Sequence, residues 1–116
     1  MLDVAWQAEY NTEAGFAVLE NLIFEGDLSF SQTLVASGAG ACTDNSVNWS
    51  GDYHLVDGTT MVISYIRCTP SGPGCLTCGA TREELTRFKF ANDCQTLTTV
   101  AIDSETARDY VSIPRR

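Results

Sequence analysis

The stretch Val47–Leu55, VNWSGDYHL, decides the fold class. Apolar residues and one glycine occupy every second position, and polar residues occupy the positions between them. A period of two is typical of a β-strand that has one face in the core and the other in water. We therefore expect an antiparallel strand here, with Trp49 and Tyr53 turned inward and His54 in solvent.

Strand patterns continue on both sides of this stretch. Asp57-Gly58 follows it and is a strong signal for a tight hairpin. Thr59–Cys68 comes next and is apolar on both faces, so we expect it to form a central strand. The five expected strands lie near residues 28–34, 47–55, 59–68, 86–90 and 95–102.

The predicted fold is mainly β, an antiparallel meander curled into a small barrel or a highly curved sheet. One short N-terminal helix is expected from Glu13 to Phe24, where a cap residue precedes apolar residues at helical spacing. A strand that includes Phe16–Leu19 is the alternative for this segment. A capping box over Thr81–Glu84 predicts a helical turn. The tail from Asp103 is polar, and Pro114 cannot donate to a strand ladder, so the end of the chain is expected to be an edge or a frayed terminus.

Length and charge limit the classes of function. The 116 residues are enough for one domain, which we place at residues 1–116. Seven basic and fifteen acidic residues give a net charge of −8, which disfavours binding to nucleic acid. Because the mean hydropathy is close to zero, we expect no membrane insertion.

Five cysteines, Cys42, Cys68, Cys75, Cys78 and Cys94, are candidates for disulfides. The favoured pairing joins Cys42 to Cys94, and Cys68 to Cys75 or Cys78. Structural zinc on the four later thiolates is a second interpretation, and a Cys75–Cys78 redox pair is a third. We expect no metal, because a zinc ribbon normally offers two cysteine knuckles and only one is present.

Cysteine density also bears on localisation, because disulfides form and persist in oxidising compartments. Met1–Val4 has neither the basic segment nor the apolar run of a secretory signal. The cysteine density leads us to expect a secreted or periplasmic protein, with the chain as given corresponding to a mature domain.

Residues 24–100 carry a resemblance to a known family. The residues that carry it are FEGDLSF from Phe24, GAC from Gly40, WSGDY from Trp49, Asp57-Gly58 and FKFANDCQTL from Phe88. In this order they resemble the small lipocalin-like domains of bacterial exported proteins, and they are also similar to the META-type barrel. The lipocalin signature has a glycine two residues before its tryptophan, where this chain has Val4 before Trp6. The resemblance implies a small, incomplete barrel.

No catalytic constellation is predicted. His54 is the single histidine and is expected to face solvent, without a nucleophile and an orienting partner. The carboxylate pairs Glu83–Glu84 and Glu20–Glu25 are expected on a solvated acidic surface. The protein is therefore expected not to be an enzyme and to use no cofactor.

The predicted function is an exported binding module for a small apolar ligand. Trp49, Tyr53 and Tyr65 would form the ligand-binding wall at the barrel mouth, between the loops Ser37–Asn45 and Thr69–Gly79. The alternative is a structural or assembly protein, including a pilin-like domain. It would form a homo-oligomer through sheet edges or a spare cysteine.

Overall fold

The computed structural model describes residues 4–12, 15–37, 45–71 and 76–114. These residues form strands and turns, and they include no helix of the length and apolar character that a membrane crossing needs. The strands are β1 (Val4–Asn11), β2 (Ala17–Phe24), β3 (Ser29–Ser37), β4 (Asn45–Leu55), β5 (Thr60–Ser71), β6 (Arg82–Ala91), β7 (Thr96–Ala101) and β8 (Thr106–Pro114).

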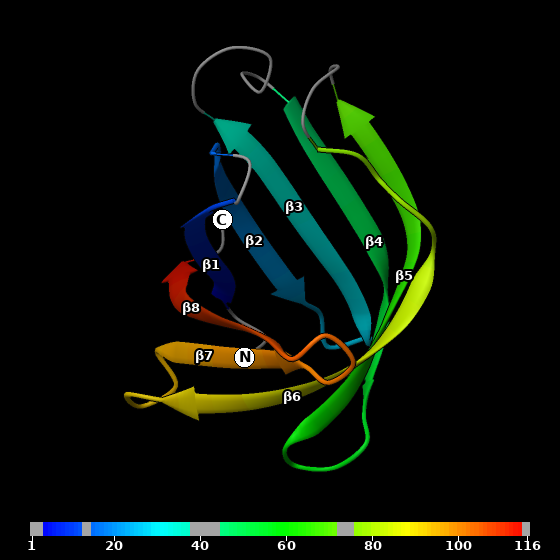
Figure 1. Cartoon of the computed structure of the whole chain (residues 1–116). Coiled ribbons are helices and arrows are strands. Elements are labelled where there is room, and N and C mark those ends of the chain that lie inside the picture. The colour runs from blue at the N-terminus through cyan, green and yellow to red at the C-terminus, as the bar shows by residue number, and fades with distance from the viewer. Residues whose placement is uncertain (1–3, 13–14, 38–44, 72–75, 115–116) are drawn as a thin grey trace.

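Each strand pairs antiparallel with its neighbours in sequence, and β8 pairs with β1, so the described strands close into a barrel (Figure 1). Val4 lies opposite Pro114 and Gln7 opposite Val111 along this closing seam. The predicted antiparallel barrel is confirmed, and the five expected strands appear as β3 to β7. The expectation of an incomplete barrel is wrong, because β1, β2 and β8 complete it.

The predicted N-terminal helix is wrong. Glu13 itself lies outside the described residues, and Ala17–Phe24 forms strand β2. Every second side chain of β2 is buried, and these residues are Val18, Glu20, Leu22 and Phe24. Apolar residues also occupy the outer face of β2. Apolar residues on both faces of the strand therefore fall three and four positions apart, which is the spacing that suggested a helix. Pairing with β1 and β3 decides the conformation.

Two other local predictions fail for a related reason. Arg82 begins strand β6, so the capping-box pattern at Thr81–Glu84 starts no helical turn. The tail after Asp103 is not frayed, since β8 pairs with β7 along its first part and with β1 along its last part. A closed sheet supplies backbone partners that outweigh these weak local preferences.

Apolar side chains fill the end of the barrel that carries the β2–β3, β4–β5 and β6–β7 turns. Phe24 is fully buried, and its ring contacts Phe30 at 5.3 Å and Tyr53 at 5.0 Å between ring centroids. Trp6 packs on Phe90 at 5.6 Å across the barrel. The residues of this apolar end are Trp6, Phe24, Phe30, Tyr53, Met61, Phe88, Phe90 and Leu97.

Gly51 lies where β4 meets an irregularity in its pairing with β5. A Cβ atom placed on Gly51 would lie 1.8 Å from the backbone oxygen of Ser64. Only glycine lets the two backbones approach this closely. Gly51 therefore makes room for the backbone of β5.

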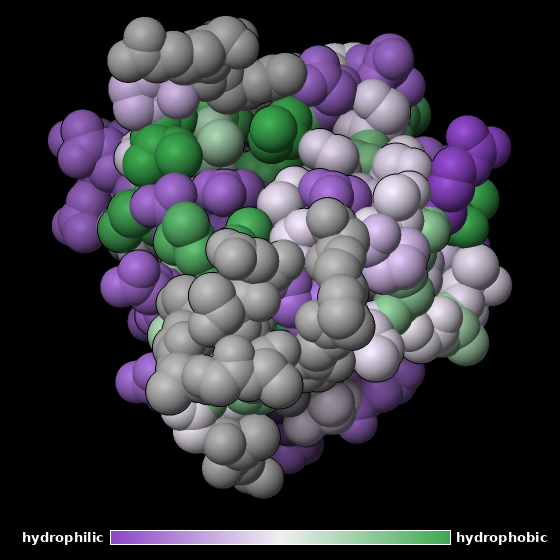
Figure 2. Space-filling view, turned by 90° about the horizontal axis from the view of Figure 1, so that it is seen from above, coloured by the Kyte–Doolittle hydropathy of each residue, from purple (hydrophilic) through white to green (hydrophobic). Residues whose placement is uncertain are grey.

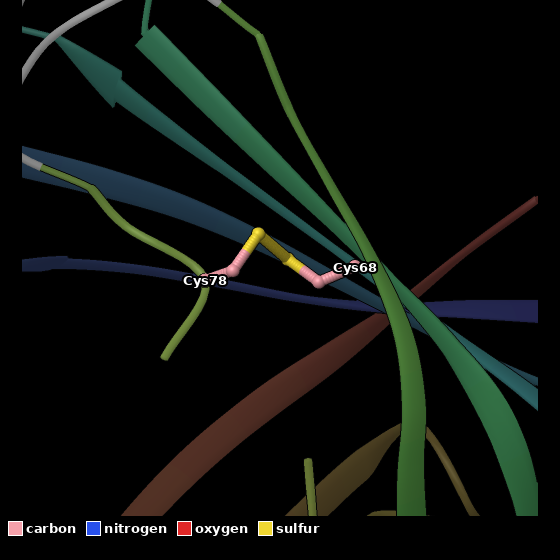
Figure 3. The surroundings of a disulfide bond; sticks show 2 residues. All are labelled: Cys68 and Cys78. Atoms are coloured by element: carbon pink, nitrogen blue, oxygen red, sulfur yellow. A yellow bond between two sulfur atoms is a disulfide. The ribbon is translucent and has the colours of Figure 1, made fainter. Parts of the chain in front are cut away.

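Cys68 and Cys78 form a disulfide with an S–S distance of 2.04 Å, which ties β5 to the segment leading into β6 (Figure 3). This confirms one of the two partners predicted for Cys68. Cys94 is a free, exposed thiol in the β6–β7 turn, so the predicted Cys42–Cys94 pair is wrong. The disulfide occupies two thiols that the zinc and redox interpretations need, so these are also wrong. Cys42 and Cys75 lie outside the described residues.

Candidate functional site

A carboxylate lies inside the barrel, next to the apolar end. Glu20 is only 4% exposed, because β2 turns it to the same side as Val18 and Leu22. The expectation that Glu20 is solvated is therefore wrong. A buried carboxylate is stable only when hydrogen-bond donors or cations surround it.

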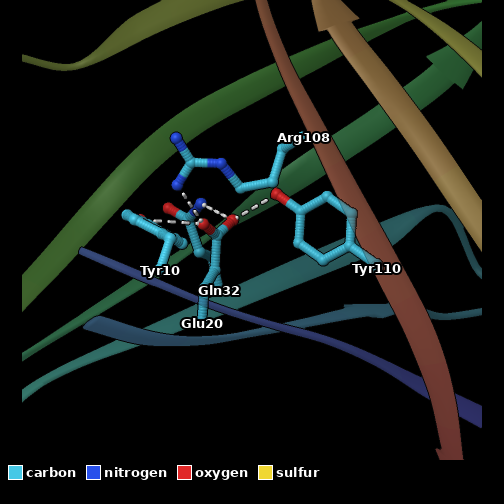
Figure 4. A network of polar contacts seen from close by, with 5 residues as sticks. All are labelled: Tyr10, Glu20, Gln32, Arg108 and Tyr110. Carbon is cyan, nitrogen blue, oxygen red and sulfur yellow. Dashed lines mark hydrogen bonds and ion pairs between the residues drawn. The ribbon is translucent and has the colours of Figure 1, made fainter. Parts of the chain in front are cut away.

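Three donors from three strands meet the Glu20 carboxylate (Figure 4). The Tyr110 hydroxyl donates to Oε2 at 2.7 Å, and Gln32 Nε2 donates to the same oxygen at 2.9 Å. The Tyr10 hydroxyl donates to Oε1 at 3.1 Å. Charged acceptors form the stronger hydrogen bonds in proteins, so these contacts fix the carboxylate in one position.

Arg108 supplies the balancing charge. Its Nη1 lies 3.5 Å from Glu20 Oε1, and its guanidinium carbon lies 3.4 Å from the centroid of the Tyr10 ring. We call Tyr10, Glu20, Gln32, Arg108 and Tyr110 the Glu20 network. Its members come from β1, β2, β3 and β8, so it links strands on both sides of the closing seam.

The tyrosines around this network keep their protons at neutral pH. Burial, with a further contribution from the Glu20 charge, raises the pKa of Tyr10 to about 12. Burial is also the first cause that raises the pKa of Tyr110, and Glu20 is the second. For Tyr65 the pKa is raised by burial and then by the charge of Glu84. All three hydroxyls therefore remain donors.

A cavity of about 230 Å³ adjoins the Glu20 network. Its lining comes from β2, β3, β5, β6, β7 and β8, together with Ser104 of the β7–β8 turn. The lining residues are Glu20, Leu22, Gln32, Ile63, Tyr65, Arg82, Glu84, Thr86, Thr99, Ala101, Ser104, Thr106, Arg108 and Tyr110.

Arg82 lies at the rim of this cavity. Its guanidinium carbon lies 3.9 Å from the centroid of the Tyr65 ring and 5.5 Å from that of Trp49. Its Nε lies 3.7 Å from Glu84 Oε2, and the Arg82 side chain is 44% exposed. The rim therefore offers an aromatic face, a cation and a carboxylate within a short distance of one another.

The structure separates the three residues predicted to bind a ligand. Tyr65 lines the cavity, and Trp49 packs edge-on against it at 5.7 Å between centroids. Tyr53 lies at the apolar end, where its hydroxyl donates to the Glu25 carbonyl at 2.9 Å. All three are buried. Most of the first loop proposed to flank the mouth, and part of the second, lie outside the described residues.

Glu20 and Arg108 were not predicted as site residues. Glu20 could have been found from its position in the alternation of Val18, Leu22 and Phe24, where a carboxylate replaces an apolar residue. Arg108 had no comparable signal, because its strand was expected to fray. The network depends on register, which a single sequence does not specify across distant strands.

A second hollow of about 620 Å³ lies where the β4–β5 turn meets β6 and β7. Arg87 and Phe88 both line it, although they point to opposite faces of β6. The hollow is therefore a notch at the outside of the barrel. Figure 2 shows the molecule from above, and hydrophobic residues gather chiefly at the upper left of this view.

The residues weighed for catalysis remain apart. His54 is exposed on the outer face of β4, as predicted, and Glu83 is exposed on β6. Among the residues described, no three His, Cys, Asp or Glu side chains are grouped so that they could hold a metal ion. Comparison of the chain with protein-family models, with curated proteins and with solved structures gave no match.

Proposed function

We propose that this protein is a small-molecule binding module whose site is the cavity beside the Glu20 network. The observation that carries this proposal is a partly open cavity of about 230 Å³ that is lined by inward-facing residues of a closed barrel. Protein interiors are otherwise closely packed, and a concave site with a few convergent polar groups is the usual form of a ligand pocket. Eight antiparallel strands in a closed up-and-down order also agree with a lipocalin-like architecture.

The chemistry of the cavity favours binding over catalysis. Glu20 and Glu84 are the carboxylates among its lining residues, and three hydrogen bonds and one ion pair engage both oxygens of the buried Glu20. A general base needs a free oxygen within reach of the proton that it removes. Glu20 is therefore a structural anchor for the wall of the site in this proposal.

The lining also refines the proposed ligand. Leu22, Ile63 and Tyr65 give the cavity an apolar side, while hydroxyls and charged groups form the rest. We therefore infer a small ligand that combines a flat apolar part with polar groups, rather than a purely apolar one. The Cys68–Cys78 disulfide supports the proposal of an oxidising, exported location.

A cavity-filling variant tests the proposal. Ligand-observed NMR with phenol and benzyl alcohol should detect binding to the wild-type protein. Thr99→Phe places a ring in the cavity and should abolish this binding. Thr98→Phe makes the same change on the outer face of β7 and should retain it, since Thr98 bonds Asp109 outside the barrel. Equal binding by the two variants would place the ligand elsewhere, and no binding to the wild type would refute the proposal.

Assembly is a second candidate function, which the exposed thiol of Cys94 favours. Barrel closure weakens the version that depends on sheet edges, because every described strand has a partner on both sides. Light scattering and non-reducing gels of the wild type and Cys94→Ser separate the two functions. A covalent dimer of the wild type that Cys94→Ser loses would support assembly. A wild-type protein that is monomeric both in light scattering and on non-reducing gels would exclude it.

A further inference from the structure

Hydrogen-bonding capacity in the cavity is unevenly used, and this bears on the ligand of the proposed function. A carboxylate accepts about four hydrogen bonds. Glu20 has Tyr10 and Arg108 against Oε1, and Gln32 and Tyr110 against Oε2. The Glu20 carboxylate therefore already has a partner for each of its hydrogen-bonding positions.

The donors of the site are less fully used. A guanidinium carries five N–H groups. Within the described part of the chain, Arg108 has one carboxylate contact at 3.5 Å and Arg82 has one at 3.7 Å, so most of their N–H groups face no carboxylate. Both line the cavity, as does Tyr65, whose hydroxyl keeps its proton. The site therefore has N–H and O–H groups in excess of acceptors.

Both guanidinium groups are also held in place. Arg82 stacks on Tyr65 and Arg108 stacks on Tyr10, at 3.9 and 3.4 Å from the ring centroids. Stacking uses the flat face of a guanidinium and leaves its edge, which carries the N–H groups, available to a planar acceptor. A pre-organised edge of this kind matches the two oxygens of a carboxylate.

Glu84 is the group that opposes an anion here. It lies at the rim beside Arg82, its side chain is 30% exposed, and it offsets the Arg82 charge as Glu20 offsets that of Arg108. The four charges sum to zero. An anionic ligand must therefore compete with Glu84 for Arg82, and removing the Glu84 charge should help it to bind.

We propose that the ligand of this cavity is a small planar carboxylate, which packs its ring against the apolar side formed by Leu22 and Ile63 and accepts hydrogen bonds from the arginines that line the site. This inference rests on the proposed binding function and specifies the ligand's charge. Arg82 is the anchor that is open to test, because its side chain is partly exposed and its replacement leaves the Glu20 network intact.

Three probes of the same shape separate charge from fit. Benzoate, benzamide and benzamidine share a phenyl ring, and their substituents are negatively charged, neutral and positively charged. Calorimetry or ligand-observed NMR should rank benzoate first, with a Kd on the order of 1 mM for so small a ligand. Equal affinities, or a preference for benzamidine, would overturn the anion inference while cavity binding stands. Loss of all three would also overturn it, and the neutral fragments tested above would then decide the binding function separately.

Rim variants give effects of opposite sign. Arg82→Gln should weaken benzoate binding about tenfold, through the lost charged hydrogen bonds. Glu84→Gln should strengthen it about threefold, since it removes a partly exposed competing charge. Arg87→Gln and Glu83→Gln make the same changes on the outside of β6 and should leave benzoate affinity unchanged. Matching effects from the inner and outer variants would show that general electrostatics, and not this site, attracts the anion.

Discussion

The two ends of the barrel interior are built differently. At the apolar end, rings from facing strands touch, and Phe24, Met61 and Leu97 have no exposed surface. At the other end, buried polar side chains meet a cavity, and Glu20, Gln32, Thr86 and Thr99 are among its lining. The aromatic contacts of the apolar end fill the barrel there, whereas the other end combines buried apolar residues with polar groups around a cavity.

This division lets a domain of 116 residues hold a cavity and still keep a packed core. A small core cannot lose many contacts before folding fails, because net stability is only a small difference between large terms. Confining the open space to one end keeps the aromatic contacts of the other end intact. If the division is real, changes at the two ends should differ in what they affect.

Alkaline pH should cause the largest effect, and chiefly through the cavity end. Tyr10, Tyr65 and Tyr110 lie there, and each has a raised pKa, as does Tyr53 at the apolar end. A raised folded-state pKa adds stability that is complete below the ordinary value of 10.0 and is lost as pH rises through the folded value, about 12 for Tyr10. We expect the tyrosines to ionise late, together with loss of the barrel.

Tyrosinate absorbance and circular dichroism, recorded over the same pH series, measure this. The chain unfolded in denaturant is the control and should titrate at about pH 10. Ionisation of most tyrosines near that pH with the barrel still folded would contradict the buried network.

Phe24→Ala should have the next largest effect. It removes a fully buried ring that contacts Phe30 and Tyr53, and the surrounding barrel cannot collapse to fill the gap. We expect the free energy of unfolding to fall by about 3–5 kcal/mol. Denaturant unfolding measures the loss, and Phe24→Leu should lose less. An effect below about 1 kcal/mol would show that the apolar end does not carry the stability of the barrel.

The apolar end was also the easier to predict. Tyr53 belongs to a long run in which apolar and polar residues alternate, so the sequence alone shows that it is inward. The hairpin at Asp57-Gly58 then positions β5 beside β4. These features are local, since each needs only neighbouring residues to be recognised.

The cavity end could not be predicted in the same way. The partners of Glu20 lie 10, 12 and 90 residues away in sequence, in Tyr10, Gln32 and Tyr110. Only the register of four strands brings them together, and two of these strands, β1 and β8, had no clear strand signal. A lone carboxylate among apolar residues looks like a solvated one until its partners are known.

Reducing the Cys68–Cys78 disulfide should have an intermediate effect at the cavity end. The bridge closes a loop between cysteines ten residues apart, and its loss should lower the free energy of unfolding by about 2–3 kcal/mol. The paired variants Cys68→Ser and Cys78→Ser should reproduce this loss, measured by urea unfolding. In the native protein without reductant, Cys94 should react with iodoacetamide, while Cys68 and Cys78 should not. Alkylation of these two cysteines would disprove the bridge.

Glu20→Gln should have the smallest effect on stability. The amide oxygen can still accept from one or two of the donors, and the Arg108 side chain is 26% exposed, so water can compensate for part of its lost ion pair. We expect a loss of about 1–2 kcal/mol in urea unfolding. Glu9→Gln removes the same charge from the exposed face of β1 and should change little.

The size of this loss tests the division between the ends directly. If Glu20→Gln destabilised the barrel as much as Phe24→Ala, the polar network would be part of the structural core, and the cavity beside it would be a consequence of packing that network. If the loss stays near 1 kcal/mol while binding of the neutral fragments changes, the carboxylate is retained for the shape and chemistry of the cavity. The second result is the one that the geometry predicts, because Glu20 lines open space and Phe24 does not.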